Sequence, residues 1–204
     1  MNSSFKAIIF DLGGVILNID YEKTISAFKT LGIPNFNDLY TQAQQNHVFD
    51  NIETGKITPA EFRTYIKEES HVNLNDDDID MAWNAMLLDL PLKRIELLKE
   101  IAKDYPIYLY SNTNEIHLNS FRKSIGEKYG DEKLLESLFI KTYYSHEINM
   151  RKPNADGFLK IVRENNLDIE STLFIDDSEQ HIIGANKVGL QTVWLHDKDI
   201  TEIF

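Results

Sequence analysis

The 204-residue sequence contains no cysteine. This absence excludes disulfide bonds, cysteine nucleophiles and thiolate metal sites, and it agrees with a reducing compartment. Positive charge is also scarce, because 21 lysines and arginines stand against 33 acids and the formal net charge is −12. We therefore expect no nucleic-acid partner and no attraction to an anionic membrane surface. An anionic substrate would need a local positive site or a metal ion.

Long hydrophobic runs are also lacking. No apolar run approaches the roughly 18 residues of a membrane-spanning helix, so no membrane contact is expected. The N-terminal apolar run is interrupted by Asp11 and has no basic segment before it, so no signal peptide is predicted. Hydrophobic residues still make up 42% of the chain, enough for a sizeable core. These features predict a cytoplasmic globular protein, either a monomer or a homodimer.

The stretch of residues 6–18 reads KAIIFDLGGVILN. A short apolar run bounded by glycine predicts a buried strand, and Asp11 stands at its C-terminal end. Functional residues of parallel α/β sheets lie at such ends. A buried lone carboxylate is costly and so needs a partner or a task. This stretch alone leaves two interpretations open: Asp11 begins a turn that Gly13 and Gly14 complete, or it is a functional acid.

The rest of the chain separates into a helical block and an alternating block. Helices are predicted over 21–32, 36–48, from 58, over 75–88 and over 91–103, with Thr58 and Glu61 forming a capping box. Strands are predicted over 106–110, 139–144, 172–175 and 191–195, each followed by a helix. This order predicts an α/β fold, a Rossmann-like parallel sheet core with an inserted all-helical cap domain. The predicted boundaries are 1–18 and 91–204 for the core and 19–90 for the cap.

Polar residues follow several of the predicted strands. Because parallel strands end at one edge of a sheet, Asp11, Ser111, Lys152 and the Asp176-Asp177 pair should converge there. Three carboxylates form a hard oxygen site that suits Mg²⁺. A serine hydroxyl and free amides at a helix start suit phosphate, and Lys152 adds a positive charge. Such a site predicts attack by Asp11 on phosphorus, with an aspartyl-phosphate intermediate.

Four motifs in this order resemble those of the haloacid dehalogenase-like (HAD) superfamily of hydrolases, over nearly the whole chain. They are FDLGGV at 10–15, YLYSN at 108–112, RKP at 151–153, and FIDDS at 174–178 with the glycines of the following helix. The combination is most similar to bacterial sugar-phosphate phosphatases of the α-D-glucose-1-phosphate phosphatase type. The resemblance implies a Mg²⁺-dependent phosphatase that acts on a small phosphorylated metabolite, with sugar phosphates as one substrate class.

The resemblance also implies a role for each motif residue. Asp11 would be the nucleophile and a metal ligand, together with the Gly13 carbonyl, Asp176 and Asp177. Ser111, the Asn112 amide and Lys152 would hold phosphate, and the side chains of Asn112 and Thr113 are further candidates for substrate contact. His181 is expected beside the site or on the helix surface rather than as a ligand.

One position departs from the superfamily pattern. Most of its phosphatases carry a second aspartate, the general acid and base, where this chain has Gly13. Proton transfer of this kind contributes about 10²–10⁴-fold to rate. His47, Glu53 and Lys56 in the cap are candidate substitutes, and each can equally be an exposed polar side chain. Two alternatives stay open for the function: a 2-haloacid dehalogenase-type hydrolase, which needs no metal, and a non-catalytic protein that binds a phosphorylated metabolite.

Overall fold

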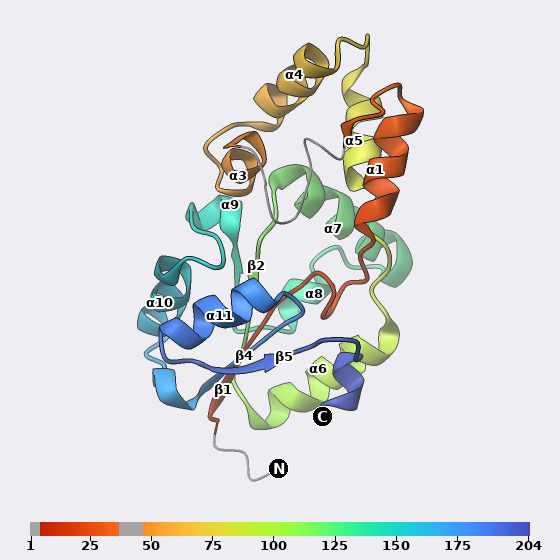
Figure 1. Cartoon of the computed structure of the whole chain (residues 1–204). Helices are drawn as coiled ribbons and strands as arrows, with labels where there is room; N and C mark the ends of the chain where they lie inside the picture. Colours follow the sequence, from red (N-terminus) through yellow and green to blue (C-terminus); the bar gives the residue numbers. More distant parts are fainter. Residues whose placement is uncertain (1–4, 37–46) are drawn as a thin grey trace.

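A five-stranded parallel sheet forms the centre of the protein (Figure 1). The computed structural model describes residues 5–36 and 47–204. Its strands stand in the order β3-β2-β1-β4-β5. They are β1 (Ala7–Phe10), β2 (Ile107–Ser111), β3 (Lys141–Tyr144), β4 (Thr172–Asp176) and β5 (Gln191–Trp194). Every pairing is parallel. The predicted α/β fold with a Rossmann-like parallel sheet is confirmed.

Helices cover both faces of the sheet, so β1 is buried on both sides. Ile8 and Phe10 pack into one apolar cluster with α6 (Leu92–Asp104) and α7 (Glu115–Tyr129). Ala7 and Ile9, which point the opposite way, pack with α10 (Ala155–Glu164) and α11 (Glu179–Lys187). A strand alternates its side chains between faces, so β1 contributes to two hydrophobic cores. The first strand and its terminal acid are thereby held from both sides.

Four of the helices that the structure describes between β1 and β2 pack on one another, away from the sheet (Figure 1). We call them the cap helices: α1 (Tyr21–Thr30), α3 (His47–Glu53), α4 (Pro59–Ser70) and α5 (Asp76–Asn84). Their shared core is rich in aromatic residues, including Phe28, Phe49, Phe62 and Trp83. The predicted helix over 36–48 lies mostly outside the described residues. The exact domain boundaries stay a prediction.

The capping box predicted at the start of α4 is present. The Glu61 backbone N–H donates to the Thr58 hydroxyl over 3.2 Å, and the Thr58 N–H donates to the Glu61 carboxylate over 2.8 Å. The two bonds satisfy backbone donors that a helix start leaves open. The reciprocal bond holds the pKa of Glu61 below its ordinary value.

Several predicted element ends were wrong. The helix predicted to residue 88 ends at Asn84, because Leu87 forms an antiparallel bridge with Ile19. The helix after β2 runs to Tyr129 and ends at Gly130, whose φ is +81°. Glycine adopts this backbone conformation without a steric cost, so it is a common stop signal for a helix. Four short helices were also not predicted: α3, α8 (Leu134–Ser137), α9 (Ser145–Ile148) and the 3-10 helix η1 (Ile169–Ser171).

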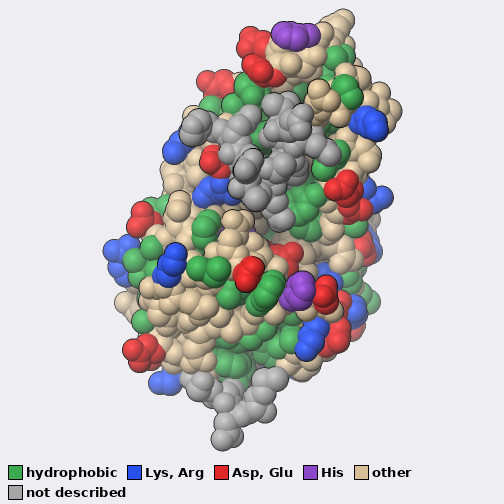
Figure 2. Space-filling model, viewed as in Figure 1, with side chains coloured by type: hydrophobic (Ala, Val, Ile, Leu, Met, Phe, Trp, Pro, Cys, Tyr) green, Lys and Arg blue, Asp and Glu red, His purple; other side chains and the backbone are tan. Residues whose placement is uncertain are grey.

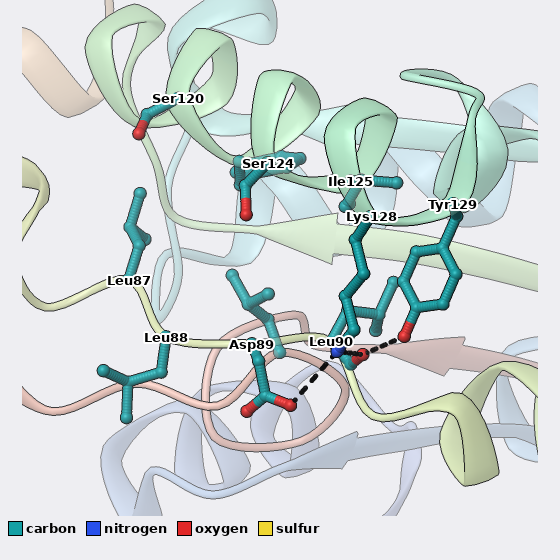
Figure 3. Close-up of a pocket in the computed structure, with 11 residues that line it drawn as sticks. Leu87, Leu88, Asp89, Leu90, Ser120, Ser124, Ile125, Lys128 and Tyr129 are labelled. Atoms are coloured by element: carbon teal, nitrogen blue, oxygen red, sulfur yellow. Dashed lines mark hydrogen bonds and ion pairs between the residues drawn. The ribbon is translucent and has the colours of Figure 1, made fainter.

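Two chain segments connect the cap helices to the sheet, and they run side by side. The Asn18 N–H donates to the Asp89 carbonyl over 2.9 Å, and the Asn18 side chain donates to the Asp89 carboxylate over 2.8 Å. Figure 3 shows that Lys128 and Tyr129 reach this segment from α7 and bond to the Leu90 carbonyl. Beside it lies a pocket of about 150 Å³ whose described lining includes none of the predicted site residues.

Charge is dispersed over one face of the molecule. On the face shown in Figure 2, acidic and basic side chains are interspersed with apolar and neutral ones. Within the described residues, no helix is long and apolar enough to cross a membrane.

Candidate active site

The predicted convergence of Asp11, Lys152 and Asp176 is present. Asp11 directly follows β1, and its N–H donates to the Ile175 carbonyl of the neighbouring β4 over 2.9 Å. Lys152 precedes α10 and is fully buried. Its Nζ lies 2.6 Å from Asp11 Oδ1 and 2.7 Å from Asp176 Oδ2. One buried ammonium group thus joins the carboxylates at the ends of two adjacent strands.

The side chain of Asn112 holds the backbone of Lys152. The Lys152 N–H donates to Asn112 Oδ1 over 2.9 Å, and Asn112 Nδ2 donates to the Lys152 carbonyl over 3.0 Å. This pair of bonds occupies both ends of the amide, so the Asn112 side chain orients the lysine in this structure. The Thr113 backbone likewise exchanges two 2.9 Å bonds with the Ser145 hydroxyl. Ser111, predicted to follow the second strand, is the last residue of β2 and is buried.

Asp176 is the more strongly held member of the acidic pair. It accepts from the Ser178 N–H over 2.8 Å, and His181 Nδ1 lies 3.0 Å from its Oδ1. Burial alone would raise the pKa of Asp176, but Lys152 and His181 outweigh burial and lower the pKa to about 2. His181 is 9% exposed and lies directly against this carboxylate. The only sign of this contact in the sequence was that His181 lies in the helix that follows the acidic pair.

Asp177 lies against the turn that follows β1. Gly14 has a φ of +75°, and a Cβ at this position would lie 2.0 Å from Asp177 Oδ2. Only glycine therefore lets the first motif and the acidic pair approach so closely. Burial, followed by the charge of Asp176, raises the pKa of Asp177 to about 6. Trp194 Nε1 donates to the Asp177 carbonyl over 2.9 Å and fixes its backbone.

The site holds more negative than positive charge. Burial and then Asp176 raise the pKa of Asp11 well above its ordinary value, although Lys152 opposes the shift. Burial lowers the pKa of His181, so this imidazole is mainly neutral at pH 7. When ionised, Asp11, Asp176 and Asp177 carry three negative charges against the single charge of Lys152. Ligand atoms of Asp11, Asp176 and His181 lie within 4.8 Å of one another. Oxygen donors with an excess of two negative charges fit a divalent cation such as Mg²⁺.

Gly13 stands where most phosphatases of the superfamily carry the second aspartate, and a side chain at this position would point toward an apolar residue. A Cβ at Gly13 would lie 3.1 Å from Ile19 Cδ1, in the segment that leads to the cap helices. Among the candidate substitutes, Lys56 is exposed, as one interpretation of the sequence expected. Glu53 is 15% exposed in its side chain and paired with Arg151, so it is not a free surface acid. The side chain of His47 lies outside the described part of the structure.

Comparison with known proteins identifies the family. The family model of haloacid dehalogenase-like hydrolases matches residues 5–189. The chain belongs to this family. Its predicted HAD-like fold and its assignment as a hydrolase are therefore confirmed. The structure is similar to HAD family enzyme BT-2542 of Bacteroides thetaiotaomicron in complex with magnesium and inorganic phosphate, with 35% identity, 98% of each chain covered and a TM-score of 0.91.

Two further comparisons separate function from fold. D-ribitol-5-phosphate phosphatase of Bacteroides thetaiotaomicron is 28% identical, covering 92% of this chain and 90% of the relative. L-2-haloacid dehalogenase of Xanthobacter autotrophicus is 16% identical, with a TM-score of 0.62 and coverage of 94% of this chain and 77% of that one. At that identity the dehalogenase shares the fold alone with this member of the family.

Proposed function

We propose that this HAD family member is a Mg²⁺-dependent phosphatase that hydrolyses a small phosphorylated metabolite through covalent phosphorylation of Asp11. The observation that supports this most directly is the buried cluster in which Lys152 pairs with both Asp11 and Asp176, so that the acids outnumber the lysine. Such a cluster is suited to bind a metal ion and a phosphorylated substrate at the same time, because the metal ion compensates the negative charge of the acids and Lys152 attracts phosphate.

The chain's residues divide the reaction into two displacements. A carboxylate oxygen of Asp11 attacks phosphorus, the bond from phosphorus to the ester oxygen breaks, and the alcohol leaves. Water then attacks the aspartyl phosphate, which releases inorganic phosphate and regenerates the carboxylate. Lys152 donates hydrogen bonds to the transferring group, and the Ser111 hydroxyl and the Asn112 backbone N–H bind its other oxygens. When bound by Asp11, the Gly13 carbonyl, Asp176 and Asp177, Mg²⁺ supplies charge stabilisation of about several kcal/mol.

The leaving alcohol needs a proton, and Gly13 cannot supply it. In this proposal a water molecule donates the proton, so turnover depends on the basicity of the leaving group. We expect a good leaving group such as p-nitrophenolate to react faster than a sugar alcohol. Without a general acid, hydrolysis of a sugar phosphate should be slower on the order of 10²–10⁴-fold, the factor that general acid catalysis contributes.

For the substrate class, we infer a sugar phosphate or sugar-alcohol phosphate. The relative named D-ribitol-5-phosphate phosphatase supports this inference, because the similarity extends over 92% of this chain. We expect phosphate release from D-ribitol 5-phosphate to exceed release from a nucleotide of equal charge. Equal rates for both would overturn the substrate class and leave the phosphatase reaction intact.

A direct experiment measures phosphate release with Mg²⁺ and with EDTA, for the wild type and for Asp11→Asn. We expect activity only with Mg²⁺ and only in the wild type. After acid quenching, mass spectrometry should find one phosphoryl group on the peptide that contains Asp11. Asp104→Asn, which removes an exposed acid, is the matched control. Retained activity in Asp11→Asn would refute the nucleophile, and metal-independent chloride release from a 2-haloacid would favour a dehalogenase.

A further inference from the structure

Arg151, the residue before Lys152, forms ion pairs with two acids of cap helix α3. Its guanidinium contacts the carboxylate of Asp50 through Nη1 and lies 3.0 Å from Glu53 Oε2 through Nη2. The Arg151 side chain is only 17% exposed. A planar guanidinium that meets two acids at once holds them in a defined geometry, which a lysine cannot reproduce.

The turn that follows α3 docks on the same part of the core. Asn149 Nδ2 donates to the Thr54 carbonyl over 2.8 Å. Gly55 has a φ of +64°, and a Cβ there would lie 2.3 Å from the His146 carbonyl oxygen. The backbone of residues 54–55 therefore lies against segment 146–151, the segment that leads directly into Lys152.

The cap helices meet the core at a second place, and the contact there is mainly apolar. Trp83 of α5 stacks on His117 of α7 with 4.9 Å between ring centroids and 10° between ring planes. Ile116 of α7 joins the apolar cluster of the cap helices. Figure 1 shows the two places apart, with α5 beside α7 and α3 beside α9. Ion pairs can break and reform in water more readily than a buried aromatic stack, so the α3 contact is the one suited to open.

We propose that Arg151 is a positioning residue: through Asp50 and Glu53 it holds the cap helices closed on the core, and so places residues 54–56 to contact the alcohol part of the substrate. This inference rests on the proposed phosphatase function. It assigns the arginine of the RKP motif to substrate closure, whereas the adjacent lysine binds phosphate.

The cap-side double variant Asp50→Asn/Glu53→Gln tests this without changing a neighbour of Lys152. We expect its KM for D-ribitol 5-phosphate to rise by about tenfold, because two charge-assisted contacts are lost. Its KM for acetyl phosphate, which has almost no group to reach the cap helices, should stay within about twofold. Arg151→Leu should show the same split, and Arg151→Lys should recover part of the loss.

Each kinetic outcome decides between roles. Equal increases of KM for both substrates would mean that Arg151 acts on phosphate through Lys152, and would overturn the proposal. An unchanged KM for D-ribitol 5-phosphate, with only a lower melting temperature, would reduce the ion pairs to a structural role. Arg163→Leu is the matched control, because Arg163 bonds only within its own helix, to the Leu159 carbonyl, among its described contacts. We expect that variant to keep the wild-type KM for both substrates.

A binding readout separates failure of this proposal from failure of the proposed function. The chain has no cysteine, so Lys56→Cys and Glu147→Cys can be labelled cleanly with pyrene on both sides of the contact. We expect excimer emission to be stronger with the wild-type ion pairs than with Asp50→Asn/Glu53→Gln, and to rise on adding Mg²⁺ and inorganic phosphate. Equal excimer emission in both proteins would overturn the closure. A clear difference, together with no phosphatase activity in the unlabelled wild type, would retain closure and reject the function.

Discussion

Replacement of Asp177 by asparagine should stabilise the metal-free protein and at the same time weaken its metal site. The pKa of Asp177 is raised from an ordinary 3.8 to about 6, first by burial and then by Asp176. A difference of about 2 in pKa, at about 1.4 kcal/mol for each unit, amounts to about 3 kcal/mol. The ionised Asp177 carboxylate therefore lowers the free energy of unfolding by this amount. Asparagine removes the charge and keeps the shape of the side chain.

The sign of the pH dependence follows from proton binding. Between about pH 4 and pH 6 the folded state binds the Asp177 proton more tightly than the unfolded state, so stability falls as the pH rises. We therefore expect Asp177→Asn to match the wild type near pH 4. Its advantage should grow through that interval and reach about 3 kcal/mol at pH 8.

Urea denaturation in EDTA, followed by circular dichroism at several pH values, measures this difference. Glu96→Gln, which changes an exposed acid to an amide on α6, serves as a control and should shift stability little at any pH. Added Mg²⁺ should stabilise the wild type more than the variant, since a ligand stabilises the state that binds it. A gain that is absent at pH 8, or equal at all pH values, would refute the charge argument. Equal stabilisation of both proteins by Mg²⁺ would exclude Asp177 as a metal ligand.

Three further predictions follow from the site and the packing. Gly14→Ala should raise the Mg²⁺ concentration needed for half-maximal activity by more than about tenfold, because its Cβ would lie 2.0 Å from Asp177 Oδ2; an unchanged Mg²⁺ titration would contradict this. Gly157→Ala should lower the free energy of unfolding by about 1–3 kcal/mol, because its Cβ would lie 1.9 Å from the buried Tyr110 hydroxyl. Gly126→Ala should cost less than Gly157→Ala, because its Cβ would lie 2.4 Å from Cγ of Glu132, whose side chain can shift, and because alanine favours a helix; equal losses in urea denaturation would disprove the distinction. Removal of Mg²⁺ with EDTA should abolish phosphate release reversibly, whereas restored turnover with EDTA still in excess would count against a metal-assisted reaction.

The sequence by itself determined the strands, the longer helices and their order. A short buried run bounded by glycine, such as 7–10, satisfies its backbone in a sheet, and the Thr58 capping box specifies where α4 begins through bonds within four residues. Four motifs in a recognisable order were enough to predict the family and the sheet edge at which Asp11 would lie. These signals are local, which is why they can be read along the chain. Helix ends were less predictable, since Asn84 ends α5 because of a bridge to residue 19, far away in sequence.

The tertiary structure alone decided which residue meets which. Sequence reasoning had left the side chain of Asn112 free for substrate, but it holds the backbone of Lys152, 40 positions away. The burial of His181 against Asp176 and the contact of Arg151 with α3 likewise depend on packing between separate elements. The pKa values of the acids follow from burial and from neighbours that the strand order β2-β1-β4 brings together. Charge interactions act through space, so their partners exist only once the chain has folded.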